Sequence, residues 1–398
     1  MFLEWRNDMY RYKCLNPIAA IGLNKFNDNY KATENVEEAD AILVRSADMH
    51  QLAVPNNVKC VARAGAGVNN IPLMELAQQG IPVFNTPGAN ANGVKELVFA
   101  AMLLAARDVV GGINWAAGQV DNANVAKDTE KEKKKFAGYE LSGKKLGVIG
   151  LGAIGVLVAN AAISLGMNVV GYDPMISVDH AWKLSRSIKR ENSLDSLMAA
   201  CDFVTVHVPL KDATRGMIGK RALSLCRKGV RVMNFSRAAL VDDDAMIEAL
   251  GDGRVAAYVT DFPTDKVLGV EGVICIPHLG ASTPESEENC AVMAAAQTRD
   301  FIEHGIIRNS VNLPAVDVAP VSTPRLLCIH ENIPNVLGSI TSTVAGFGLN
   351  ISELVNRSRG AMAVSVIDID EVPHRMRDAL LDKTQEIAGM KRVRLLGV

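Results

Sequence analysis

Paired cysteines are missing from this 398-residue chain. Its seven cysteines are an odd number, and none of them belongs to a C-x-x-C pair. This pattern excludes a disulfide framework and a zinc knuckle, so we expect no metal site and a reducing compartment.

A long apolar run is also missing. The longest one, residues 97–106, is too short to span a bilayer and predicts a buried helix. Residues 1–14 contain charged and aromatic side chains but no apolar core of a signal peptide. We therefore expect a cytoplasmic protein without a membrane partner.

An excess of charge of either sign is missing as well. The formal net charge is −2, so nothing in the total favours nucleic acid or an anionic membrane as a partner. Hydrophobic residues make up 48% and charged residues 22%, which is typical of a globular protein. The length predicts two or three domains.

The middle of the chain, residues 92–283, alternates β-rich runs with helical patterns. The candidate strands are residues 146–150, 168–172, 203–208, 230–234, 255–260 and 273–276. Such alternation predicts an α/β fold with a doubly wound, Rossmann-type parallel sheet.

The N-terminal region repeats this alternation more weakly, with strand-like runs at residues 41–45, 60–64 and 83–85. A long helical pattern at residues 285–305 follows the last strand of the middle region and can return the chain to the N-terminal region. We therefore predict a discontinuous domain of residues 1–91 and 284–310 around a middle domain of residues 92–283.

The end of the chain differs in pattern from both. Residues 311–324 belong to a proline-containing stretch without helical period, which predicts a linker. Residues 325–398 fit the order strand, helix, strand, strand, helix, strand, with strands at residues 325–330, 351–358, 361–368 and 393–398. This order predicts a ferredoxin-like βαββαβ module.

A glycine-rich loop directly follows the first strand of the middle region. Gly150, Gly152 and Gly155 form G-x-G-x-x-G, with Ala153 and Ile154 inside the loop, and a helical pattern and a second strand follow. These glycines suit a tight turn, a close approach of the pyrophosphate and close helix packing, and the helix N-terminus favours anions. Asp173, after the second strand, can accept both ribose hydroxyls and would repel a 2′-phosphate, so NAD is favoured over NADP.

Three later segments place reactive side chains after strands. Arg237 follows residues 230–234, Asp261 and Asp265 follow residues 255–260, and His278 follows residues 273–276. Ligands of open α/β sheets bind at the carboxyl edge of the strands. A histidine can take a hydroxyl proton, a carboxylate can stabilise the imidazolium, and an arginine can bind a substrate carboxylate, which predicts oxidation of a 2-hydroxy acid.

These segments resemble the D-isomer-specific 2-hydroxyacid dehydrogenases over about residues 40–315. The resemblance also includes Val61-Ala-Arg-Ala-Gly-Ala-Gly67, Asn85-Thr-Pro-Gly88, Lys95-Glu-Leu97 and Val206-His-Val-Pro-Leu210. It implies NAD as cofactor, a flavodoxin-like substrate domain, a homodimer or homotetramer, and Arg237 and His278 as catalytic residues. It further implies that His207, Pro209 and Asp261 contact the cofactor.

The catalytic acid stays open between two residues. Phe262 aligns with the phenylalanine of the family motif D-x-F-x-x-E-P, which places Asp265 at the position of the glutamate that pairs with histidine, and we favour this residue. Asp261 is the alternative because Asp265 is shorter than glutamate. Ala238 also departs from the family pattern, which has glycine after the arginine.

Two further likenesses concern the substrate. Arg45 and Ser46 resemble the pair with which family members acting on 3-phosphoglycerate contact their substrate, the arginine binding the phosphate. The resemblance adds Asn90 and the backbone around Ala64 and Gly65 as substrate contacts. Lys133, in the lysine-rich run of residues 131–135, is a further candidate for a phosphate; the alternative is an ordinary solvated stretch.

The C-terminal module resembles an ACT domain through His330-Glu-Asn332 and the later Asn350. In serine-regulated members of the family these positions bind L-serine between paired ACT domains, which implies L-serine as an effector. Asn335 stands where glycine is usual. The alternative is a module that serves dimerisation alone.

Together these resemblances imply NAD-dependent oxidation of 3-phospho-D-glycerate to 3-phosphohydroxypyruvate, the first step of L-serine biosynthesis. The substrate is then a small phosphorylated 2-hydroxy acid. One alternative is a hydroxypyruvate or glyoxylate reductase of the same family. The others are a non-catalytic NAD-sensing protein on this fold and an amino-acid sensor with a vestigial dehydrogenase part.

Overall fold

The computed structural model describes residues 9–397, which form two compact units. The first unit combines the residues up to Ala89 with those from Glu287 onward, and the second contains Asn90–Ser286. Residues 1–8, which belong to the segment considered above for a signal peptide, and residue 398 lie outside the described residues. The chain thus leaves the first unit and later returns to it.

The second unit is built on a seven-stranded parallel sheet with the order β12-β11-β10-β9-β6-β7-β8. Its strands are β6 (Lys145–Ile149), β7 (Asn168–Tyr172), β8 (Lys189–Arg190), β9 (Phe203–Val206), β10 (Val230–Asn234), β11 (Val255–Thr260) and β12 (Val273–Cys275). The strand order runs outward from β6 in both directions, which confirms the doubly wound fold. The two-residue strand β8 was not predicted, because its exposed basic residues carry no apolar pattern.

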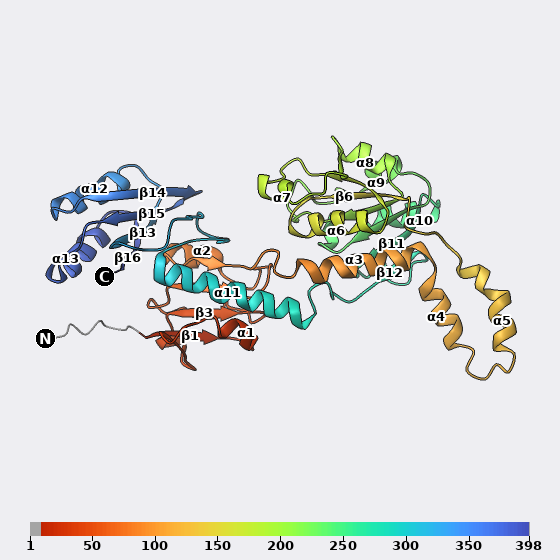
Figure 1. The fold of residues 1–398 in the computed structure, drawn as a ribbon, viewed down its shortest axis with the longest axis horizontal. Helices are drawn as coiled ribbons and strands as arrows, with labels where there is room; N and C mark the ends of the chain where they lie inside the picture. Colours follow the sequence, from red (N-terminus) through yellow and green to blue (C-terminus); the bar gives the residue numbers. More distant parts are fainter. Residues whose placement is uncertain (1–8, 398) are drawn as a thin grey trace. The chain divides into compact units, whose positions relative to one another are not determined.

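Helices cover both faces of this sheet, and Figure 1 shows α3 and α8 on opposite sides of it. The helical segments are α3 (Ala91–Ala106), α4 (Val109–Ala117), α5 (Val125–Glu132), η2 (Lys133–Phe136), α6 (Ala153–Ser164), α7 (Val178–Trp182), α8 (Leu194–Ala200), α9 (Lys220–Leu225), η3 (Ala238–Leu240) and α10 (Asp243–Gly251). Val98 of α3 and Val156 of α6 share one apolar core, and Leu197 of α8 and Met246 of α10 share the other. All four residues of β9 are buried, because helices cover both faces of the sheet.

The apolar run at residues 97–106 lies in α3 as predicted. Among residues 9–397, no helix combines the length and the apolar character that crossing a bilayer requires.

The first unit contains a five-stranded parallel sheet with the order β2-β1-β3-β4-β5. Its strands are β1 (Tyr10–Cys14), β2 (Tyr30–Ala32), β3 (Ala41–Val44), β4 (Cys60–Arg63) and β5 (Val83–Phe84). The helical segments around it are α1 (Ala20–Leu23), η1 (Val36–Glu38), α2 (Leu73–Gln78) and α11 (Pro284–His304). This is the flavodoxin-like strand order. Ile42 packs on the side of α2, while its neighbour Ala41 packs on the side of α11, because successive side chains of a strand alternate between faces.

The same unit contains a C-terminal module with a four-stranded antiparallel sheet, ordered β14-β15-β13-β16. Its elements are β13 (Arg325–Glu331), α12 (Val336–Gly346), β14 (Ile351–Arg359), β15 (Met362–Ile369), α13 (His374–Gln385) and β16 (Met390–Leu396). The element order and the strand order are those of a ferredoxin-like βαββαβ module. One face of the sheet packs on α12 and α13, and the other joins the core that contains α11.

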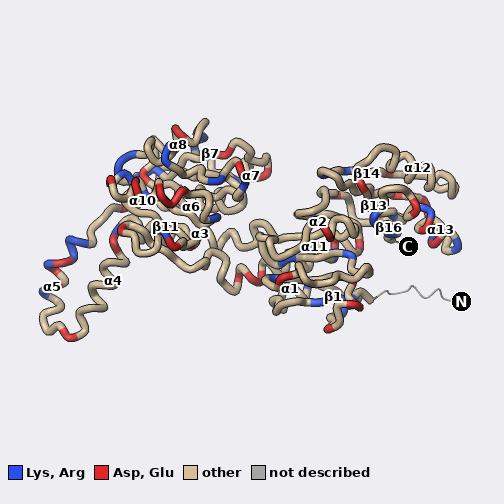
Figure 2. Tube along the Cα trace, turned by 180° about the vertical axis from the view of Figure 1, so that it is seen from behind, with Lys and Arg blue, Asp and Glu red and all other residues tan. Residues whose placement is uncertain are grey.

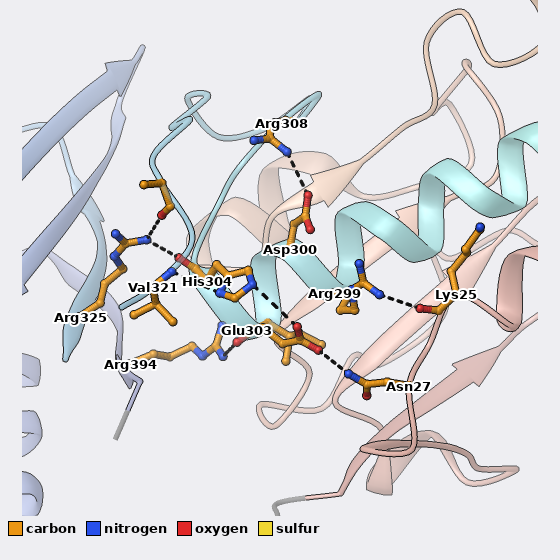
Figure 3. A network of polar contacts seen from close by, with 12 residues as sticks. Lys25, Asn27, Arg299, Asp300, Glu303, His304, Arg308, Val321, Arg325 and Arg394 are labelled. Atoms are coloured by element: carbon orange, nitrogen blue, oxygen red, sulfur yellow. Dashed lines mark hydrogen bonds and ion pairs between the residues drawn. The ribbon is translucent and has the colours of Figure 1, made fainter. Parts of the chain in front are cut away.

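Arginines of the module bind the carboxyl end of α11 (Figure 3). Arg394 donates to the carbonyl oxygens of Phe301 (3.4 Å) and Ile302 (2.6 Å), and its guanidinium lies 5.3 Å from the centre of the Phe301 ring. Arg325, which is 1% exposed, donates to the carbonyl oxygen of His304 at 2.9 Å. The last carbonyls of a helix have no partner within the helix, and these arginines donate to three of them; Phe301 also accepts the backbone N–H of Gly305.

The predicted linker is a packed segment. Leu313 and Val316 are fully buried, and Val316 pairs with Ile307 in an isolated antiparallel bridge. The side chain of Asn312 accepts a hydrogen bond from the backbone of Val83 and donates to the carbonyl of Ile81. Residues 311–324 therefore join the module to the sheet without a flexible spacer.

Replacing Arg394 with methionine should loosen the contact between the module and α11. The variant keeps the apolar stem but removes the donor to the carbonyl of Ile302, which costs about 2 kcal/mol. We expect hydrogen exchange of the protected amides of β16 and of the last turn of α11 to become about 30-fold faster.

Arg357, an exposed arginine of β14, is the matched control. Its methionine variant should leave exchange nearly unchanged. Equal acceleration in both variants would show that general loss of charge, and not the helix-end contact, is responsible.

Candidate active site

The glycine-rich loop has the geometry of a phosphate-binding turn. Gly150 has a φ of +89°, and a Cβ there would lie 2.5 Å from the carbonyl oxygen of His207. At Gly155 a Cβ would lie 1.9 Å from the carbonyl oxygen of Gly150, so α6 packs too closely on β6 for any other residue. A Cβ at Gly152 would meet no protein atom within 4 Å, which leaves the N-terminus of α6 open for a ligand.

Asp173 is fixed next to this loop. One carboxylate oxygen accepts the backbone N–H of Leu151 at 2.8 Å, and the other accepts that of Met175 at 2.8 Å. The carboxylate therefore stands beside the loop with lone pairs still available for hydroxyl donors.

Two buried polar atoms at the same edge have no partner within the described part of the chain: Nδ1 of His207 and Oδ1 of Asp261. Nε2 of His207 contacts the hydroxyl of Thr205 at 2.9 Å, and burial lowers the pKa of His207 to about 3, so the ring is neutral near pH 7. Unpaired buried polar atoms are costly. A ligand with hydrogen-bonding groups, such as the amide and ribose groups of NAD, fits this edge. Pro209 lies exposed on the loop that follows His207.

The structure brings Arg237 and His278 together around one aromatic ring. Arg237 follows β10, Phe262 follows β11, and His278 follows β12, and these three strands are neighbours in the sheet. The Phe262 ring lies 4.5 Å from the His278 ring, and the Arg237 guanidinium lies 5.8 Å from the Phe262 ring. Sequence reasoning used Phe262 only to align the acidic motif. The position of Phe262, next to Asp261 and directly after a strand, could have indicated that its ring packs against the side chains of the site.

Of the two candidate acids, Asp261 is the buried one. Asp261 is 1% exposed, and its Oδ2 accepts the backbone N–H of Gly280 at 3.3 Å. Burial raises the pKa of Asp261, and the charges of His278 and Arg237 oppose this rise. Asp265 is exposed and forms no hydrogen bond or ion pair within residues 9–397. The geometry therefore favours Asp261, the alternative, over Asp265, the residue favoured by the motif.

The predicted substrate residues of the first unit follow two neighbouring strands. Arg45 and Ser46 come directly after β3, and Ala64 and Gly65 come directly after β4. The side chain of Asn16, which sequence reasoning missed, accepts the backbone N–H groups of Arg45 (3.0 Å), Ser46 (3.0 Å) and Ala47 (2.9 Å). The Arg45 guanidinium forms an ion pair with Glu287 at the start of α11.

Asn90 and Lys133 belong to the second unit. Asn90 precedes the first residue of α3. Lys133 begins η2, is exposed, and pairs with Glu130. Figure 2 shows basic and acidic residues mixed along α5.

The predicted serine residues do not come together within one copy of the module. His330 is 3% exposed, and its ring contacts the carbonyl of Glu331 (2.7 Å) and the hydroxyl of Ser365 (2.9 Å). Asn332 and Asn350 are exposed and flank opposite ends of the 11-residue helix α12, which separates them by roughly 16 Å at 1.5 Å per residue.

Asn335, which stands where glycine is usual, has a φ of +71°. Asparagine tolerates this left-handed region better than most residues, so the loop keeps a conformation that suits glycine.

Residues 99–280 match the model of the family described as "D-isomer specific 2-hydroxyacid dehydrogenase, NAD binding domain". The chain is 37% identical to D-3-phosphoglycerate dehydrogenase of Archaeoglobus fulgidus over 292 residues, which are 71% of this chain and 53% of the relative. It is 36% identical to the human protein of the same name over 324 residues, which are 78% of this chain and 57% of the relative. The chain thus spans less than two thirds of the length of these relatives.

Solved structures share the fold. The NAD⁺-bound 3-phosphoglycerate dehydrogenase of Entamoeba histolytica matches with a TM-score of 0.60 and 26% identity, over 76% of this chain and 98% of that one. A glyoxylate reductase of Paecilomyes thermophila matches with a TM-score of 0.61 and 23% identity, over 76% and 98%. Because members with different substrates have the same fold, the fold alone does not select the substrate.

Replacing Asp261 with asparagine should stabilise the protein in a pH-dependent way. Burial raises the pKa of Asp261 above its unfolded value, so the folded state loses stability as the pH rises through the unfolded and folded pKa values. The variant removes this loss. We expect a higher midpoint of thermal unfolding at pH 8, with a gain that shrinks as the pH is lowered toward 4.

Asp265→Asn is the control, since Asp265 is exposed. It should shift the midpoint little at any pH. A gain in Asp261→Asn that does not depend on pH would contradict burial of an ionised carboxylate as its cause.

Proposed function

We propose that this chain oxidises 3-phospho-D-glycerate to 3-phosphohydroxypyruvate with NAD. The match of residues 99–280 to the D-isomer specific 2-hydroxyacid dehydrogenase family supports this reaction type. The observation that carries the proposal is the meeting of Arg237, Asp261 and His278 at neighbouring strand ends around Phe262. The names of the relatives support the choice of substrate.

In this reaction the C2 hydroxyl loses its proton to His278, and C2 becomes a carbonyl as its hydride leaves. The chemistry that bound NAD would supply is acceptance of this hydride. The loop Gly150–Gly155, with Ala153 and Ile154, would hold its pyrophosphate, and Asp173 would hold its adenosine ribose.

The charges of the site fit these roles. The Asp261 carboxylate stabilises the imidazolium that forms on His278. The Arg237 guanidinium, held against Phe262, is suited to bind the substrate carboxylate through two parallel hydrogen bonds. Arg45 would bind the phosphate, with Ser46, the backbone of Ala64 and Gly65, and Asn90 as further substrate contacts.

The second candidate is reduction of an unphosphorylated 2-oxo acid, such as hydroxypyruvate or glyoxylate. One observation favours it: the Arg45 guanidinium is already paired with Glu287. The non-catalytic NAD sensor has less support, because it leaves the arrangement of Arg237, Asp261 and His278 without a purpose.

We also propose that the protein is a cytoplasmic homo-oligomer. The hairpin of α4 and α5 extends from the sheet of its unit (Figure 1), and neither helix contains a buried residue. Ile113 is 60% exposed and Val120 is 86% exposed, so the hairpin offers apolar surface to a second copy. Lys133 lies at the end of this hairpin, where it can approach the phosphate of a substrate that is bound to a second copy of the chain.

Replacing His278 with asparagine should lower kcat by about 10²- to 10⁴-fold, since the proton acceptor is lost. The assay is NADH consumption with 3-phosphohydroxypyruvate, hydroxypyruvate and glyoxylate in parallel. NADH binding, measured by fluorescence, should persist.

His180→Asn, on the exposed helix α7, is the control and should keep its turnover. Higher rates of the unvaried protein with unphosphorylated acids would favour the reductase. Full turnover in His278→Asn would refute the mechanism, and NADH binding without turnover in the unvaried protein would favour the sensor.

L-serine should lower the rate of NADH consumption if two modules pair and bring Asn350 of one copy to His330 and Asn332 of the other. Asn332→Ala and Asn350→Ala should each weaken this inhibition, and neither should unfold the module because both side chains are exposed. D-serine is the matched ligand control. If L-serine does not inhibit the enzyme, the alternative that the module serves dimerisation alone is favoured.

A further inference from the structure

Glu287 and Arg45 form an ion pair in the first unit. Glu287 lies in the first turn of α11, and Arg45 is the first residue after β3. The two side chains are 42% and 44% exposed, so solvent and ligands can reach both of them.

Both partners of this pair are held by rigid elements. The backbone of Arg45 is fixed by the Asn16 side chain, and its carbonyl accepts a hydrogen bond from Nε of Arg63 at 3.0 Å. Glu287 stands on a 21-residue helix that buries Cys290 and Ala294 against the sheet. The backbone positions that carry the two side chains are therefore held in place.

A second observation places the same groups together. Burial raises the pKa of the Cys290 thiol, while the positive charges of Arg63 and Arg45 oppose the rise and Glu287 adds to it. Cys290 lies three residues after Glu287, on the same side of α11. Any group that binds Arg45 from this side thus meets the carboxylate of Glu287 as well.

The charge of the ligand determines how strongly the Glu287 carboxylate repels it. A phosphate group carries up to two negative charges near pH 7, whereas a hydroxyl or a methyl group carries none. Coulomb repulsion between Glu287 and the phosphate opposes the attraction of Arg45, and the repulsion is absent for an uncharged end group. The pair therefore weakens selection for the phosphorylated acid.

We propose that Glu287 is a specificity-determining residue, which lowers the preference of the Arg45 subsite for a phosphorylated over an unphosphorylated substrate. This inference rests on the proposed function, because it assigns Arg45 to the distal end of the substrate. The competing interpretation is that the ion pair is an ordinary exposed salt bridge, which a phosphate displaces at no cost in binding free energy.

The test compares Glu287→Gln with Glu288→Gln and with the unvaried protein. Glu288 is the next residue of the helix, is exposed, and forms no ion pair within the described part of the chain, so its variant removes the same charge without touching Arg45. The measured quantity is the ratio of kcat/KM for 3-phosphohydroxypyruvate to kcat/KM for hydroxypyruvate.

We expect Glu287→Gln to raise this ratio about tenfold, mainly through a lower KM for the phosphorylated acid. Glu288→Gln should change it less than twofold. An unchanged ratio in Glu287→Gln, or an equal rise in both variants, would overturn the proposal.

A binding measurement separates this proposal from the proposed function. Inorganic phosphate is titrated by calorimetry into each protein in the presence of saturating NADH, which keeps phosphate from the glycine-rich loop. Glu287→Gln should bind phosphate about tenfold more tightly, and Arg45→Met should abolish the gain when combined with it.

The two measurements fail independently. If no variant acts on the phosphorylated acid but Glu287→Gln binds phosphate more tightly, the proposed function falls, and what stands of the inference is that Glu287 weakens anion binding at Arg45. If the enzyme acts on the phosphorylated acid but neither the ratio nor phosphate binding responds to Glu287→Gln, the function stands and the role of Glu287 is refuted.

Discussion

Parallel pairing places the carboxyl ends of neighbouring strands at one edge of a sheet, and both parallel sheets of this chain depend on that constraint. In the second unit, the residues after β10, β11 and β12 supply Arg237, Asp261 and His278. These residues are 17 to 41 positions apart in sequence, so only the register of the strands brings them together. In the first unit the same rule places Arg45 beside the backbone of Gly65, because Val44 pairs with Arg63.

Helix α11 connects the Arg45 loop to the C-terminal module within the first unit. Its first turn carries Glu287, which pairs with Arg45, and its last turn is bound by Arg325 and Arg394 of the C-terminal module. A helix of this length leaves four carbonyls unpaired at its end. The module donates to three of them, the carbonyls of Phe301, Ile302 and His304, so displacing the module would break these hydrogen bonds.

Much of this could be predicted from local pattern. The strands β7, β10 and β11 lie at the predicted residues, because each contains valines at mostly buried positions of the sheet. The glycine-rich loop has the expected turn, because close backbone contacts at Gly150 and Gly155 leave no room for a side chain. Other features depend on contacts that no local pattern reveals. Asn16 fixes a loop 29 residues away, and residues 311–324 look like a linker although Leu313 and Val316 are buried. The choice between Asp261 and Asp265 required burial, since a family motif aligns residues but does not show which carboxylate is desolvated.

The distribution of unsatisfied polar atoms gives an independent argument for the site. Leaving a buried polar atom without a partner costs about 1–3 kcal/mol, which a domain of ordinary stability does not accumulate without a compensating use. Within the described part of the second unit, the two buried side-chain atoms without partners are Nδ1 of His207 and Oδ1 of Asp261. Both follow strands at the carboxyl edge, on either side of β10, and the open space at Gly152 lies at the same edge. A ligand that supplied hydrogen-bonding groups to these two atoms would offset both costs on binding.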